Sequence, residues 1–427
     1  MEDVAAAAAA MAVPLPDDLL LEILVRMKDD AALFRCATTC KHWRRLVADP
    51  GFLRRCWPQD HWSSSFVGFF TRIRGRRRRD GDADPTPVMA PCFIPGPESG
   101  PDGRYLISFL SAAPAGLFDC AVPLVSRRGL VLVRLIKAHD TPSYADPTIL
   151  HLAVCNLLAG TWDMLPPLKF RSAFNDYMWN GYAILTSTDC PSQEEPLLPV
   201  PPINPSFFKV VIIGSGRDDL MYTLHVFSSD KASWSARSNC FNTNAQSHRY
   251  GSFSDAVVCR GMAHWVFYYY ECFHIINMNG RTGHISSMKL PFSTNFHYMS
   301  QPCLSVAING MLSLLWMRKS DSQVEIWEQH EDHENMGSTS KWLHSRTIWL
   351  KQPRKNIQGR ELCVLREKCG TLLISDSNGC VYTADLETGM MVQLVDWPHK
   401  RSILPWDAMP LDMDWPTIFI SRLIRYS

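Results

Sequence analysis

Apolar residues near the N-terminus recur with the spacing of α-helices. Those between positions 20 and 27 follow the i, i+3, i+4, i+7 pattern, which places them on one face of an amphipathic helix. Asp17 is the predicted N-cap of this helix. A second apolar stripe runs from Leu33 to Val47, and Asp49-Pro50-Gly51 stops it. Two helices of this size have little core of their own, so we expect a third element or a partner to cover them.

From about Tyr105 to the end, the pattern changes to short apolar or alternating runs separated by turn residues, which is typical of β-strands. The runs recur in units at roughly 50–80 residue intervals, the range of four-stranded propeller blades with loop insertions. Five units are visible, at Leu124–Leu165, Phe208–Arg237, Ala256–Leu290, Cys303–Leu350 and Cys363–Leu394.

A sixth blade would form if Trp415–Leu423 joined a strand near Tyr105–Leu110. Such a closure removes exposed sheet edges, which otherwise invite aggregation. The predicted fold is therefore mainly β, with a small N-terminal α module followed by a β-propeller-like domain. Five or six blades fit the pattern, and six are favoured.

Residues 72–104 separate the two regions and are poor in apolar side chains, which predicts a linker or long surface loop. The predicted organisation is an Ala-rich disordered N-terminus at 1–11, a helical module at 12–57, a basic linker rich in Pro, Gly and Asp at 58–104, and the β domain at 105–427.

The segment from Leu15 to Leu24, followed by Cys40–Leu46 and Asp49-Pro50, resembles the F-box. That family pattern is Leu-Pro, a Leu/Ile stripe ending in Ile-Leu, and a distal Cys/Ser-Lys/Arg-x-Trp-x-x-Leu. The match covers about a tenth of the chain. Met27-Lys28 departs from the usual Leu-Pro, and Thr39 from the common valine, which puts the strength of adaptor binding in doubt.

The β region is similar to the F-box-associated domains of plant proteins, through motifs such as Val154-Cys155-Asn156 and Leu165-Pro166-Pro167. The resemblance implies the substrate-recognition subunit of a Skp–cullin–F-box (SCF) E3 ubiquitin ligase. The F-box would bind a Skp-type adaptor and through it a cullin scaffold, while the β domain would hold a protein substrate. We expect no catalytic residue, no metal and no cofactor. Which residues bind the substrate is not readable from the sequence.

Ten residues are predicted to form the adaptor-binding site, and Leu24→Asp is expected to abolish adaptor capture because it places a charge in an apolar contact. These residues are Leu15, Pro16, Leu19, Leu20, Ile23, Leu24, Leu33, Cys40, Trp43 and Leu46.

Two alternatives to the ligase role stay open. One is a propeller scaffold that binds proteins outside any ligase and carries a degenerate F-box. The other is a propeller enzyme, but the histidines at 264, 274, 284 and 297 and the acids around 330–334 show no nucleophile–base or paired-carboxylate spacing. We interpret Trp234, Trp265, Trp327, Trp342 and Trp349 as blade core rather than as a ligand cage.

The formal net charge of +1 gives no global field for nucleic acid or a membrane, but one basic run stands out. This run can be interpreted as a solvated loop, a nuclear-import signal or a contact to nucleic-acid phosphates. No aromatic residues lie between the arginines, as stacking of single-stranded nucleic-acid bases would need. The residues are Arg72, Arg74, Arg76, Arg77, Arg78 and Arg79.

The 14 cysteines form no CxxC pair and follow no recognisable secretory leader, so they read as core residues of a reducing compartment. Cys36, Cys40 and His42 lie close together, but a helix turns His42 away from the other two, and no second ligand pair follows.

No apolar run reaches the roughly 18–20 residues of a membrane span. We expect a cytoplasmic or nuclear protein.

Overall fold

The structure is a computed structural model that divides into two units, residues 1–64 with 414–427 and residues 65–413. The statements below concern the residues that it describes, which are 15–27, 30–57, 66–71, 92–96, 121–135, 149–157, 161–169, 180–190, 207–215, 221–235, 238–242, 252–269, 272–290, 302–307, 309–318, 322–331, 340–351, 361–394, 408–416 and 423.

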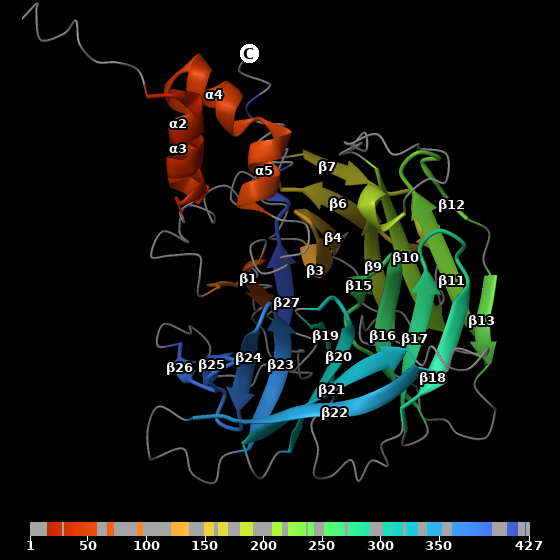
Figure 1. The fold of residues 1–427 in the computed structure, drawn as a ribbon. Helices are drawn as coiled ribbons and strands as arrows, with labels where there is room; N and C mark the ends of the chain where they lie inside the picture. The colour runs from red at the N-terminus through yellow and green to blue at the C-terminus, as the bar shows by residue number, and fades with distance from the viewer. Residues whose placement is uncertain are drawn as a thin grey trace, which may run out of the picture. The chain divides into compact units, whose positions relative to one another are not determined.

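The first unit is a cluster of short helices, in which α2 packs against α4 and α5, and α3 packs against α4 (Figure 1). Side chains start two of them: Asp49 Oδ1 accepts the Phe52 N–H at 2.9 Å, and Cys40 Sγ accepts the Trp43 N–H at 3.4 Å. The helices are α2 (Asp17–Val25), α3 (Asp30–Thr39), α4 (Lys41–Val47) and α5 (Pro50–Cys56).

The predicted N-cap of α2 is wrong by one residue. Pro16 occupies the N-cap position and makes no side-chain cap, and Asp17 is already the first helical residue. The Asp17 carboxylate instead contacts α4, with His42 Nε2 at 2.9 Å and Arg45 Nη2 at 3.8 Å. An acidic residue in the first turn still suits the positive end of the helix dipole.

The core of this unit includes a residue from the far end of the chain. Leu423 is 1% exposed and packs with the buried side chains of the helices, and Trp415 packs at the edge of the same cluster. The predicted use of Trp415–Leu423 as a blade strand is therefore wrong, because both apolar side chains are used by the helical core. The core residues of the helices are Leu24, Leu33, Ala37, Val47, Phe52, Leu53 and Trp57.

The second unit is a six-bladed β-propeller whose strands pair antiparallel within each blade. The five predicted units correspond to blades 2 to 6. Blade 1 contains β27 (Ala408–Asp412), β1 (Phe66–Thr71) and β2 (Cys92–Pro95). Blade 2 contains β3 (Ala121–Arg127), β4 (Leu130–Leu135), β6 (Leu152–Asn156) and β7 (Thr161–Met164). Blade 3 contains β9 (Gly181–Thr186), β10 (Phe208–Ser215), β11 (Met221–Ser228), β12 (Ser233–Trp234) and β13 (Ser238–Asn242).

Blade 4 contains β14 (Ser252–Phe253), β15 (Val257–Cys259), β16 (Met262–Tyr269), β17 (Cys272–Asn279) and β18 (Ile285–Lys289). Blade 5 contains β19 (Cys303–Val306), β20 (Leu312–Arg318), β21 (Gln323–Glu331) and β22 (Ser340–Trp349). Blade 6 contains β23 (Leu362–Lys368), β24 (Thr371–Asp376), β25 (Val381–Asp385) and β26 (Met391–Gln393). A separate short pair joins β5 (Ile149–Leu150) to β8 (Leu168–Lys169), and the 3₁₀ turn η6 (Ser187–Asp189) follows β9.

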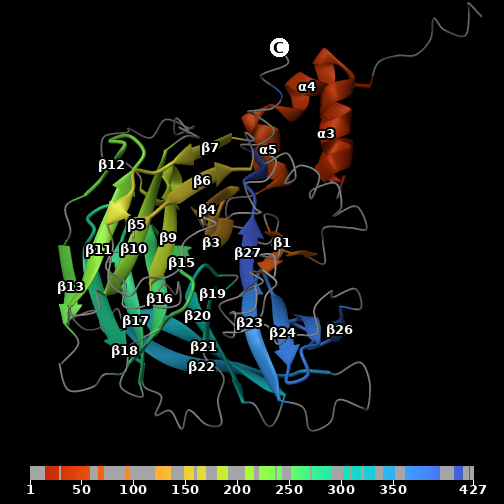
Figure 2. The same ribbon diagram turned by 180° about the vertical axis from the view of Figure 1, so that it is seen from behind.

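The ring closes in blade 1. Its inner strand β27 contacts the inner strands β3 and β23 of the two neighbouring blades and pairs with β1, from Phe66 opposite Asp412 to Thr71 opposite Ala408 (Figures 1 and 2). The sixth blade is confirmed, but its strands come from 66–71 and 92–95, inside the predicted linker, and from 408–412. Phe69 is fully buried there against Leu365 and Leu373 of blade 6, which a solvated linker would not provide.

Apolar clusters fill the seams between neighbouring blades. Separate clusters join blades 2 and 3, 3 and 4, 4 and 5, 5 and 6, and 6 and 1. Trp265, fully buried between blades 3 and 4, donates its indole N–H to the Tyr182 carbonyl at 3.2 Å. Each large apolar side chain buried in a seam stabilises the ring by about 1.5–3 kcal/mol.

Three predicted features lie outside the described residues: the Ala-rich 1–11, the arginine run at 72–79 and the strand at 105–110. In the described part of the chain, no helix has the length and apolar character needed to cross a membrane.

Candidate functional site

Helix α2 carries apolar side chains on two faces. Leu15, just before the helix, and Leu19 and Ile23 within it are 52%, 51% and 54% exposed. Their spacing of four residues places them in one row along the helix. Large apolar side chains in a contiguous exposed row are typical of an interaction surface. We call this row the α2 stripe.

The other apolar face of α2 belongs to the core of the helical unit. Leu20 and Leu24 are buried, and Leu24 packs with Leu33 of α3. Leu46 of α4 is buried as well, and Trp43 is half-buried at the edge of the core. The ten predicted adaptor-binding residues therefore divide into an inner and an outer set. The outer set consists of Leu15, Pro16, Leu19, Ile23 and Cys40.

Polar contacts hold α2 against the other helices without covering the α2 stripe. Glu22 pairs with Arg55 of α5, and the hydrogen bond and charge of Arg55 hold the pKa of the Glu22 carboxyl below its usual value. At the start of α2, Asp17 pairs with His42 and Arg45 of α4. These contacts fix the orientation of the helix and so of its exposed leucine and isoleucine side chains.

Sequence comparison shows which family the helices of this unit are similar to. Residues 14–56 match the F-box-like family. They form an F-box-like domain. A putative F-box protein of Arabidopsis thaliana is 44% identical over 59 residues, a stretch that covers 14% of this chain and 15% of that relative. This chain therefore spans only a small part of that relative's length.

Solved structures with related arrangements share little sequence with this chain. The β-propeller domain of Cps50 (Swd1) from Myceliophthora thermophila is 10% identical, with a TM-score of 0.34 over 66% of this chain and 84% of that one. An α-L-arabinanase of Penicillium chrysogenum is 9% identical, with a TM-score of 0.33 over 67% and 90%. The propeller assignment rests on the strand pairing above.

The propeller has its own cluster of buried charges, at the C-terminal ends of inner strands. Arg127 of β3 donates to Asp189 of η6, with Nη2 to Oδ1 at 2.6 Å, and its Nη1 lies 4.0 Å from Asp412 of β27. Lys368 of β23 lies 3.5 Å from the same Asp412 carboxylate. Charges from blades 1, 2, 3 and 6 thus meet in one network, which pairs groups that would be costly to bury alone.

A second polar contact spans the ring. Arg366 of β23 pairs with Asp255, which precedes β15, at 2.9 Å, so it links blade 6 with blade 4. Glu367 accepts from Ser305 of blade 5, and burial raises the pKa of its carboxyl. Arg366 and Glu367 thus have polar partners in neighbouring parts of the ring, which gives both residues a structural role.

One buried set has the residue types of a thiol nucleophile, a base and an orienting group, and sequence reasoning missed it. Cys259 Sγ lies 3.4 Å from His264 Nε2, and His264 Nδ1 lies 2.8 Å from Asn277 Oδ1. Burial raises the pKa of the Cys259 thiol to about 11 and lowers the pKa of His264. Both shifts oppose the thiolate–imidazolium pair that nucleophilic catalysis uses. The arrangement is therefore suited to packing, and only strand pairing brings it together.

The five tryptophans predicted as blade core differ in their exposure. Trp265 and Trp342 are buried, and Trp234 and Trp327 half-buried, whereas Trp349 is 63% exposed, so its prediction as blade core is wrong. It ends β22, which is the outer strand of blade 5 in the pairing of the described residues. Within the described residues, no group of three or more His, Cys, Asp or Glu side chains is placed to hold a metal ion.

Proposed function

We propose that this chain is the substrate-recognition subunit of an SCF E3 ubiquitin ligase. The α2 stripe docks on a Skp-type adaptor that connects to a cullin scaffold, and the propeller holds a protein substrate. The chain contributes no catalytic group. It acts by raising the effective concentration of the bound substrate near a ubiquitin-charged enzyme.

The observation that carries this proposal is the α2 stripe, three large apolar side chains exposed on a domain that matches the F-box-like family. Burying each side chain contributes about 1.5–3 kcal/mol. The inner set, which includes Leu20, Leu24 and Leu33, keeps α2 in place. Pro16 and Cys40 are exposed and complete the proposed surface, with Trp43 and Leu46 supporting it from within.

The test is capture of a purified Skp-type adaptor by the full chain and by Leu19→Asp and Ile23→Asp variants. A charge in an apolar contact costs several kcal/mol, so both variants should lose adaptor binding by roughly a hundredfold or more. Leu343→Asp is the matched control, because Leu343 of β22 is also 51% exposed but lies in the propeller.

Capture by the unmodified chain and by Leu343→Asp, with loss in both α2 variants, supports the proposal. Unchanged capture by the α2 variants would contradict docking through the stripe. If the unmodified chain captures no adaptor, the protein is better explained as a propeller scaffold outside any ligase.

A further inference from the structure

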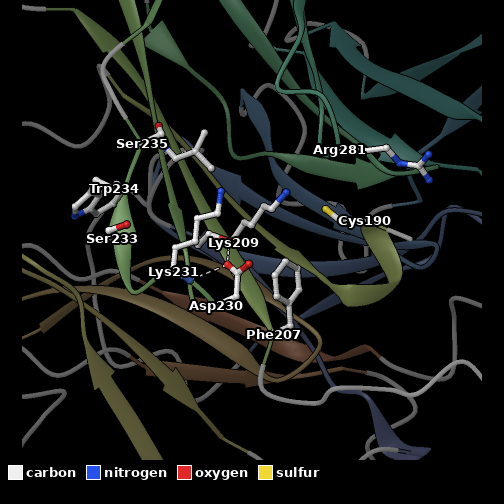
Figure 3. Close-up of a pocket in the computed structure, with 11 residues that line it drawn as sticks. Cys190, Phe207, Lys209, Asp230, Lys231, Ser233, Trp234, Ser235 and Arg281 are labelled. Carbon is white, nitrogen blue, oxygen red and sulfur yellow. Dashed lines mark hydrogen bonds between the residues drawn. The ribbon is translucent and has the colours of Figure 1, made fainter. Parts of the chain in front are cut away.

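A pocket of about 470 Å³ opens on the propeller between blades 3 and 4 (Figure 3). It is bounded by β10, β11 and the turn into β12 on blade 3, and by the β17–β18 turn on blade 4. Its lining residues are Cys190, Phe207, Lys209, Val226, Ser228, Asp230, Lys231, Ser233, Trp234, Ser235 and Arg281.

The charged side chains of the pocket are predominantly positive. Lys209, Lys231 and Arg281 contribute three positive charges and Asp230 one negative charge, which leaves a net +2. In Figure 3, Lys209 and Lys231 extend to the same side with their ammonium groups away from Asp230, and the Arg281 guanidinium points outward at the rim. This distribution favours a ligand with two negative charges.

Lys209 is held in position across the blade seam. Its Nζ donates to the Gly280 carbonyl of blade 4 at 3.1 Å, and Cys190 Sγ donates to the same carbonyl at 3.4 Å. An ammonium group has three N–H donors, so two remain for a ligand. Because the neighbouring blade already fixes the side chain, little further rotamer entropy is lost on binding.

Asp230 shapes the turn that presents Lys231. Its Oδ1 accepts from the Ser228 hydroxyl and from the Lys231 backbone N–H, at 2.9 Å for the latter. The Ser228 hydrogen bond contributes most to holding the pKa of the Asp230 carboxyl below its usual value, so this group stays negative at neutral pH. It therefore opposes an anionic ligand while it supports the turn.

Aromatic and apolar side chains line the rest of the pocket. The Trp234 indole N–H donates to the Pro166 carbonyl at 2.8 Å, which fixes the orientation of its ring. Phe207 lies beside Lys209, with the ammonium 6.0 Å from the ring centroid, and Val226 adds apolar surface. A flat apolar group next to the anion has surfaces to pack against.

We propose that this pocket binds a phosphate monoester whose dianion meets Lys209 and Lys231 and whose aromatic body packs against Phe207. The phosphate offers three acceptor oxygens, which suits two ammonium groups and the Ser233 and Ser235 hydroxyls better than a carboxylate does. The ester is carried either by a small molecule or by a phosphorylated tyrosine side chain. This site is separate from the α2 stripe and does not depend on adaptor docking.

The test is calorimetric titration of the full chain with phenyl phosphate, benzoate and inorganic phosphate. Phenyl phosphate should bind most tightly and weaken as salt is added. Lys209→Gln and Lys231→Gln should each weaken binding roughly tenfold, since each loses a charge-assisted hydrogen bond. Lys351→Gln is the matched control, because Lys351 is an exposed lysine outside the pocket and should change nothing.

Asp230→Asn gives an effect of opposite sign. It keeps an oxygen that accepts the Lys231 N–H but removes the negative charge, so phenyl phosphate should bind more tightly, by a few-fold. Absence of saturable binding by the unmodified chain, or equal losses in the Lys231 and Lys351 variants, would overturn the proposal. Weaker binding by Asp230→Asn would also contradict it.

A phosphotyrosine peptide distinguishes the two sources. Tighter binding than phenyl phosphate, lost in Lys231→Gln, assigns the site to a protein side chain, whereas equal or weaker binding assigns it to a small ester. Adaptor capture by Lys231→Gln should equal that of the unmodified chain, so failure of this proposal and failure of the adaptor proposal are told apart.

Discussion

Ile23 and Leu24 are adjacent in α2, yet Ile23 is 54% exposed and Leu24 1%. Leu24 packs among the side chains that hold the helices together, so Leu24→Asp would place a charge in the core. Loss of adaptor binding by that variant would report unfolding rather than a broken contact. Ile23 and Leu19 are the positions at which docking is tested separately from folding.

At this scale we predict that Leu24→Ala lowers the free energy of unfolding of the helical unit by about 2–5 kcal/mol, the usual cost of truncating a buried leucine. Ile23→Ala should change it by less than about 0.5 kcal/mol, as expected for an exposed position. Chemical denaturation followed by the helical circular dichroism signal measures both. Equal destabilisation by the two variants would contradict the assignment of their faces.

At the scale of elements, the F-box-like domain includes a contribution from the C-terminal segment. Leu423 and Trp415 join a core built from α2 to α5, which partly answers the expectation that two short helices need covering. A fragment that ends after α5 lacks both side chains. Adaptor capture is therefore tested on the full chain.

We predict that Leu423→Ala destabilises the helical unit by about 2–5 kcal/mol, because Leu423 is as deeply buried as Leu24. Leu343→Ala provides the control, since Leu343 is exposed on β22 and its truncation should cost little. Denaturation of the two variants followed by helical circular dichroism makes the comparison. A Leu423→Ala variant as stable as the control would show that the helical core is complete without the tail.

At the scale of the whole molecule, the charges of Arg127, Asp189, Asp412 and Lys368 connect four blades of the ring. Burial alone would raise the pKa of Asp189, but the charge and hydrogen bonds of Arg127 and the Thr186 N–H bring it down to about 2. For Asp412, burial is likewise outweighed by Lys368, by Arg127 and by the Arg128 N–H, so its pKa is also lowered. Both groups therefore stay charged in the folded ring.

A depressed carboxyl pKa stabilises the fold above the unfolded-state value and loses that contribution as pH falls towards the folded value. For Asp189 this window runs from 3.8 down to about 2. We predict that the thermal unfolding midpoint of the propeller decreases as the pH is lowered through this window. The Asp189→Asn variant should have a lower midpoint at neutral pH, and its midpoint should change less with pH. Asp163→Asn, on the exposed strand β7, should follow the unmodified protein. Identical pH profiles for all three proteins would contradict this role of Asp189.

Several features of this chain could be predicted because their signals are local. The helical spacing between 20 and 47, the paired runs of blades 2 to 6 and the F-box pattern all depend on residues that are near one another in the sequence. Short turns such as Asn309-Gly310, where the glycine has a φ of +74°, are local as well. Such local patterns indicate a strand or a helix without reference to the rest of the fold, so the fold class and the α module could be predicted from the sequence.

The tertiary structure alone decided which side of each element is covered. Both faces of α2 are apolar in sequence, and only packing against α4 and α5 separates Leu24 from the α2 stripe. The closing pair β1–β27 and the seam that holds Lys209 against Gly280 join segments distant in sequence, which no periodicity encodes. The sequence by itself determined the helices and most blades, while ring closure, the exposed face of α2 and the pocket between blades 3 and 4 follow from long-range packing, because burial depends on the whole fold.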